Sequence, residues 1–169
     1  MRQLIVIILL FFIIDNGFSQ EIAQWRGPAR DGIYPETGLL KKWPEEGPKL
    51  LLKIEGFGKG NSQAVVYKNK IFITGLKSDT LDVISSYNMK GELLWSKTYA
   101  RAWSVTYRES RSTPTIENDR IYLIGGMGDV VCMDANNGNI LWTQDAHKQF
   151  HGEYNKWGLA ESALLTDNA

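Results

Sequence analysis

Short runs of β-branched and aromatic residues, each closed by Gly, Asn or Lys, make up most of the chain after residue 60. The first four runs lie at residues 64–67, 71–74, 83–87 and 92–95. Runs of this length and composition are typical of short antiparallel strands joined by hairpins. No amphipathic stretch of helical length follows residue 60, so the pattern predicts an all-β region.

The same four-run pattern then returns. Its members lie at residues 114–116, 121–124, 130–133 and 139–142, and a third copy begins at 162–165 with its turn at Asp167-Asn168. Ser62, Ser112 and Ser162 mark the repeat at intervals of 50 residues. Four strands in roughly 40 to 50 residues is the period of a β-propeller blade. The sequence therefore predicts a β-propeller with two complete blades of four antiparallel strands and partial flanking strands.

A turn followed by a tryptophan closes both complete repeats. The turn glycine is Gly91 in one copy and Gly138 in the other, and Trp95 and Trp142 follow four residues later. Glycine permits a positive φ in the hairpin, Asp134 can accept a turn N–H, and an indole offers a large apolar surface to a neighbouring blade. We expect these five residues to dock blades rather than to contact a cofactor.

The repeat also sets the domain boundaries. We expect a signal peptide at 1–20, an entry segment at 21–60, blades at 61–110 and 111–156, and a truncated further blade at 157–169. Residues 48–52 are expected to form a partial outer strand, with Leu52 at the tryptophan position. Blades bury their faces only when a ring of about four to eight closes. We therefore expect an N-terminal fragment of a longer propeller; a two-blade protein that oligomerises to cover its edges is the alternative.

The N-terminus predicts export. Arg2 precedes an uncharged apolar run at residues 4–14, and a polar segment with small residues follows at 16–20. This arrangement is typical of a secretory signal peptide, here with cleavage near Ser19 or Gln20. A helix of this length rises about 16 Å, whereas the hydrocarbon core of a bilayer is about 30 Å thick. We expect a periplasmic or secreted protein without a stable membrane span after cleavage; a retained anchor is the alternative.

Charge and ligand counts exclude some partners. Lysine plus arginine equal aspartate plus glutamate at 19 each, so no basic field predicts nucleic-acid binding. One cysteine, Cys132, and two histidines, His147 and His151, are too few for a four-ligand zinc site, and no metal site is predicted. We expect Cys132 to be a small buried apolar residue on a strand. Both histidines are expected on the surface of a loop.

Candidate chemistry lies just before the repeated serines. Asn61, Arg111 and Glu161 occupy the equivalent position of three repeats. They would suit a polar ring facing a channel, where the arginine binds a carboxylate or pairs with the glutamate. Exposed loop residues without a ligand are the alternative. No catalytic residue is predicted: Ser112 lies in no G-x-S-x-G motif, and the glycine loop at 56–60 lacks a GKS or GKT ending.

The turn motif resembles that of pyrroloquinoline-quinone (PQQ) propellers, which has the form A-x-D-x-x-T-G-K-x-x-W. Asp134, Gly138 and Trp142 match it, whereas Cys132 and Asn139 stand where the family has Ala and Lys. The segments at 24–28, 30–32, 37–40 and 43–44 resemble the entry segment of exported bacterial PQQ-like repeat proteins. Together the resemblance covers residues 24–169 and implies the propeller fold more specifically than any chemistry.

Two functions follow from this resemblance. The first is an exported binding or scaffold module for an unknown protein or small-molecule ligand, similar to the outer-membrane assembly lipoprotein of like fold. The alternative is a quinoprotein dehydrogenase that oxidises alcohols or sugars with PQQ and calcium. Alcohol-oxidising relatives carry an adjacent pair of cysteines, and here Cys132 stands alone. No cysteine directly follows the apolar run, so lipidation is not expected.

Overall fold

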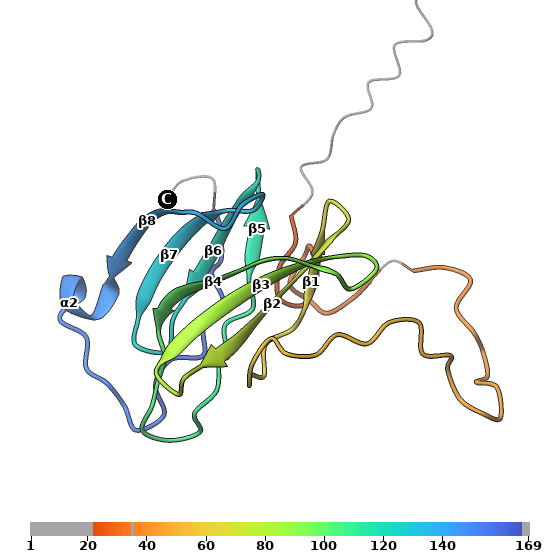
Figure 1. Cartoon of the computed structure of the whole chain (residues 1–169), viewed down its shortest axis with the longest axis horizontal. Coiled ribbons are helices and arrows are strands. Elements are labelled where there is room, and N and C mark those ends of the chain that lie inside the picture. Colours follow the sequence, from red (N-terminus) through yellow and green to blue (C-terminus); the bar gives the residue numbers. More distant parts are fainter. Residues whose placement is uncertain (1–21, 35, 167–169) are drawn as a thin grey trace, which may run out of the picture.

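The fold consists of two four-stranded antiparallel sheets that lie side by side (Figure 1). The computed structural model describes residues 22–34 and 36–166. The first sheet contains β1 Val65–Tyr67, β2 Lys70–Lys77, β3 Leu81–Asn88 and β4 Leu93–Arg101. The second contains β5 Thr115–Glu117, β6 Arg120–Ile124, β7 Asp129–Asp134 and β8 Ile140–Asp145. The expected signal peptide and the turn at Asp167-Asn168 lie outside the described residues.

Each sheet is a meander whose strand order follows the chain, as in a propeller blade. The all-β prediction is thus confirmed, and every run in the two complete repeats coincides with a strand. Several strands are longer than predicted: β2 continues to Lys77, β4 to Arg101 and β8 to Asp145. Tyr99 and Ala100 are buried at the end of β4, and their packing stabilises the extra length of the strand. The polar residues that precede them do not indicate this extension.

A single apolar core joins the two sheets. Its fully buried members come from both blades, including Phe72, Ile84, Ile116, Leu123 and Met133. Strands β4 and β7 contact each other across the seam between the blades. Cys132 is completely buried on β7, as expected, and this burial raises the pKa of its thiol. The two blades are therefore packed as one unit.

The hairpin turns are held by their first polar residue. The carboxylate of Asp134 accepts the N–H groups of Asn136 and Asn137, at 2.7 and 3.3 Å. In the preceding copy the amide oxygen of Asn88 accepts two backbone N–H groups in the same way. The turn glycines Gly91 and Gly138 have φ values of 82° and 71°, a region that favours glycine.

Each turn glycine also contacts a large side chain from the preceding repeat. A Cβ on Gly138 would lie 2.6 Å from Cε3 of Trp95, so the indole rests directly on this turn. A Cβ on Gly91 would lie 2.8 Å from Cδ1 of Leu52, the residue at the tryptophan position one repeat earlier. Trp142, at the end of the second blade, is 43% exposed. Each glycine thus leaves room for a large side chain from the repeat before it.

Two of the expected strands are not formed. Residues 48–52 adopt no regular structure, and Leu50 and Leu51 are 75% and 84% exposed. They belong to a long loop that runs away from the sheets, orange to gold in Figure 1. Residues 162–165 are not a strand either. A strand needs a hydrogen-bonded neighbour, and no described strand pairs with either segment. The apolar composition alone predicted these strands wrongly.

A five-residue helix, α2 Ala146–Phe150, follows β8 where a loop was expected. Its N-cap is Asp145, whose carboxylate accepts the N–H of Lys148 at 2.9 Å. The surface prediction was wrong for His147, which is half-buried and stacked on Tyr154 with ring centroids 4.0 Å apart. It was right for His151, which is exposed at the end of the helix. No helix in the described part of the chain is long and apolar enough to cross a membrane.

Candidate functional site

The starts of the three repeats lie side by side. The N–H of Gln63 donates to Oγ1 of Thr113 at 3.0 Å, and the N–H of Thr113 donates to Oγ of Ser162 at 3.0 Å. Gly60 and Ser110 form a parallel bridge one step earlier. The 50-residue spacing in the sequence is therefore a physical contact between the inner ends of successive repeats.

These inner ends surround a pocket of about 480 Å³. Asn61, Arg111 and Glu161 all line it, so the structure brings the three candidate residues together. The other lining residues are Trp25, Arg30, Ser62, Gln63, Thr113, Ala160 and Ser162. The volume falls within the roughly 300–1,000 Å³ of small-molecule sites.

Arg111 is fixed by backbone carbonyls. Its guanidinium donates to the carbonyl oxygens of Tyr107, at 2.7 Å, of Thr106 and of Trp157. These carbonyls carry no net charge, and Arg111 forms no ion pair with Glu161 or any other described carboxylate. The sequence suggested that Arg111 either binds a carboxylate or pairs with Glu161. The structure of the described residues does not contain the Arg111–Glu161 pair.

Arg30 provides a second guanidinium that the repeat pattern did not identify. It donates to the carbonyl oxygens of Ala163 and Ser162, at 2.8 and 3.3 Å, and to Oε1 of Gln24. Its guanidinium carbon lies 5.8 Å from the ring centroid of Trp25. Since Arg30 belongs to the entry segment, it has no counterpart 50 residues away that would mark it in the sequence.

The entry segment reaches the pocket by pairing with the second blade. The backbone of Ala23 donates to and accepts from Ile116 at 2.9 and 2.7 Å, on the edge of β5 that β6 does not occupy. This pairing holds Gln24 and the following residues along the inner edge of the blade. Trp25 and Arg30 become pocket walls as a result.

A buried carboxyl lies at the seam behind this site. Asp82 is 2% exposed; its Oδ2 accepts the N–H of Gly126 at 3.1 Å, and its Oδ1 has no hydrogen-bond partner. Burial raises the pKa of Asp82 to about 6, although the Gly126 N–H, the Ser110 hydroxyl and the charge of Arg111 oppose the shift. The sequence analysis did not identify Asp82, because a single aspartate in an apolar run carries no motif.

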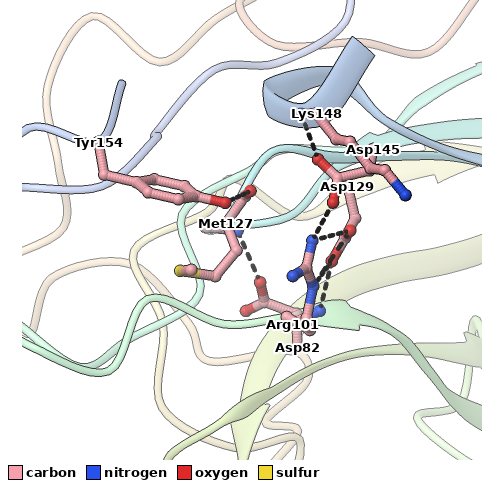
Figure 2. Close-up of polar contacts among 8 residues, drawn as sticks. Asp82, Arg101, Met127, Asp129, Asp145, Lys148 and Tyr154 are labelled. Atoms are coloured by element: carbon pink, nitrogen blue, oxygen red, sulfur yellow. Dashed lines mark hydrogen bonds and ion pairs between the residues drawn. The ribbon is translucent and has the colours of Figure 1, made fainter. Parts of the chain in front are cut away.

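An ion-pair cluster closes the outer part of the same seam (Figure 2). Nη2 of Arg101, on β4, lies 2.6 Å from Oδ1 of Asp129 and 2.8 Å from Oδ2 of Asp145. These contacts hold the pKa of Arg101 well above its ordinary value. The pKa of Asp145 is lowered by the N–H of Lys148 and by Arg101. One guanidinium of the first blade therefore joins two strands of the second.

The glycine loop at 56–60 has a structural role. Lys59 pairs with Leu76 on β2, and a Cβ on Gly58 would lie 2.5 Å from the carbonyl oxygen of Leu76. The glycines thus permit close backbone packing rather than a phosphate cradle. No group of three or more His, Cys, Asp or Glu side chains suited to a metal occurs within 22–34 and 36–166.

Together, the four-stranded blades and the 50-residue repeat define a β-propeller architecture. A family model described as outer membrane protein assembly factor BamB matches residues 53–161. The chain belongs to this family of PQQ-like repeat proteins. No curated protein matches the chain.

Proposed function

We propose that the chain is an exported β-propeller module that binds or scaffolds a partner at the inner ends of its blades. The observation that carries this proposal is that Asn61, Arg111 and Glu161 come from three repeats yet line one pocket. The residue that follows each of them is a serine in all three repeats, as expected for a position with a structural role. Three polar side chains of different charge that converge on one pocket suit a ligand with several polar groups.

Export is supported by the apolar run at residues 4–14 and by the family, whose description names an outer-membrane assembly factor. The test is to express the chain with a C-terminal tag in a Gram-negative bacterium, fractionate the cells and sequence the mature N-terminus. We expect periplasmic protein cleaved near Gln20, and cytoplasmic protein when residues 2–20 are deleted. Uncleaved full-length protein in the cytoplasm would contradict export.

The outer face of β8 supports further blades. Trp142 is 43% exposed, whereas the equivalent Trp95 packs into the seam with the next blade. By continuity with that seam, we infer that β8 packs against another blade of the same kind, with a turn glycine beneath Trp142. This contact would extend the two described blades toward a closed ring.

The described residues do not fit the alternative function, a PQQ-dependent dehydrogenase. Cys132 is completely buried and cannot reach a quinone, and the donor set of the described residues includes no cluster suited to calcium. The test is to measure reduction of an artificial electron acceptor with alcohols or sugars, with and without PQQ and calcium. We expect no activity; activity that requires both additions would overturn the binding-module proposal.

A further inference from the structure

We propose that the pocket at the inner ends of the blades binds a free α-amino acid with an apolar or aromatic side chain. This inference rests on the proposed binding function and gives its ligand a chemical class. A zwitterion presents a carboxylate and an ammonium group a short distance apart. The pocket presents cations and an anion on neighbouring segments, together with one aromatic wall.

The carboxylate end is assigned to the two guanidiniums. Arg30 and Arg111 both line the pocket, and each is held in place by backbone carbonyls distant from it in the sequence. Neither arginine forms an ion pair with a carboxylate in the described part of the chain, and neither Nε–H has an acceptor there. The free Nε–H of a fixed guanidinium can donate to a carboxylate oxygen, and prior fixation reduces the entropy lost on binding.

The ammonium end is assigned to Glu161. Its side chain is exposed, lines the same pocket and has no ion pair within the residues described. A carboxylate here attracts an ammonium group and repels a phosphate dianion, which the arginines alone would also accept. Asn61, Ser62 and Gln63 add neutral hydrogen-bonding groups between the charged ends. The charge pattern therefore favours a zwitterion over a simple anion.

The side chain of the ligand is assigned to Trp25. It is the aromatic residue among those that line the pocket, and it is 41% exposed. The guanidinium carbons of Arg26 and Arg30 lie 5.3 and 5.8 Å from its ring centroid and hold the indole in position. A partly exposed aromatic ring beside charged groups suits an apolar or aromatic side chain better than a polar one.

The test is isothermal titration calorimetry of the full chain with four probes: L-phenylalanine, L-phenylalaninamide, 3-phenylpropionate and inorganic phosphate. The amide lacks the carboxylate, and 3-phenylpropionate lacks the ammonium group. We expect L-phenylalanine to bind at least tenfold more tightly than each of the other three. No binding of L-phenylalanine, or binding no tighter than that of 3-phenylpropionate or phosphate, would overturn the proposal.

Two variants test which residue binds the ammonium group of the ligand and which binds its carboxylate. Glu161→Gln removes an exposed charge without a partner, so folding should be retained while the preference for L-phenylalanine over 3-phenylpropionate is lost. Arg111→Lys should weaken the binding of L-phenylalanine and of 3-phenylpropionate at least tenfold, because both carry a carboxylate. The affinity for L-phenylalaninamide should not change. Glu55→Gln is the matched control, because Glu55 is 73% exposed, lies outside the pocket and should change nothing.

The two proposals fail in different ways. A chain that is exported but binds none of the probes contradicts the amino-acid ligand and leaves the exported module intact. A chain that binds L-phenylalanine but remains in the cytoplasm contradicts export and leaves the pocket chemistry intact. If Glu161→Gln keeps the full preference for L-phenylalanine, Glu161 does not bind the ammonium group and the zwitterion model is wrong.

Discussion

Replacing the buried carboxyl at the blade seam tests how the protein's stability depends on pH. Asp82 is 2% exposed, and Oδ2 accepts one N–H while Oδ1 has no partner. Asparagine has nearly the same shape, keeps an oxygen for the Gly126 N–H and does not titrate. Asp82→Asn therefore removes the proton equilibrium with little change in packing.

The magnitude follows from linkage. The native pKa of Asp82 is about 6, above the roughly 3.9 of an unfolded aspartate, so the native state binds the proton more tightly. Its stabilising contribution is complete below about pH 4 and is lost as the pH rises through about 6. About two pKa units correspond to about 3 kcal/mol. Because an unfolded aspartate is already about half ionised at pH 4, wild type should lose about 2 kcal/mol relative to Asp82→Asn between pH 4 and pH 7.

The assay is urea unfolding followed by tryptophan fluorescence at pH 4, 5, 6 and 7. Wild type, Asp82→Asn and the control Asp79→Asn are compared at each pH; the side chain of Asp79 is 69% exposed. We expect the curves of free energy against pH to diverge for Asp82→Asn and to stay parallel for Asp79→Asn. Parallel curves for wild type and Asp82→Asn, or a wild type that gains stability relative to the variant with rising pH, would refute the reasoning.

Four further variants probe the contacts between blades. Trp95→Ala should lower the free energy of unfolding by about 2–3 kcal/mol because the indole packs on the neighbouring blade. Trp142→Ala should cost at least about 1 kcal/mol less, because 43% of Trp142 is exposed. Urea melts that show equal losses would contradict this asymmetry. Gly138→Ala should cost at least about 1 kcal/mol, measured as a lower Tm, since φ is 71° and the new methyl group meets Trp95. Arg101→Gln should cost up to about 1 kcal/mol, and less in 1 M NaCl, because the side chain is 50% exposed; a loss independent of salt would argue against an ionic role.

The strands and turns could be predicted because their causes are local. A β-branched run, a turn glycine and a repeated serine each leave a trace within a few residues, and the 50-residue interval relates the copies. The same interval placed Asn61, Arg111 and Glu161 at equivalent positions, and the structure places all three on one pocket. That they bind a ligand stays a prediction.

The missed features depend on contacts between distant segments. Arg30 reaches the pocket because Ala23 pairs with Ile116, a partner that no sequence pattern indicates. Asp82 acquires its raised pKa from burial against the second blade. Residues 48–52 have the composition of a strand but no partner along their edge, so composition predicted an element that pairing does not support.

The central claim is that the inner ends of three successive repeats form one binding site. The most direct measurement is NMR of the ¹⁵N-labelled chain titrated with L-phenylalanine. We predict shifts of backbone amides confined to residues 61–63, 111–113 and 160–162 and to the neighbours of Trp25. Shifts centred instead on the second cavity, beside Val65 and Val66, or no shifts at saturating ligand, would contradict the account.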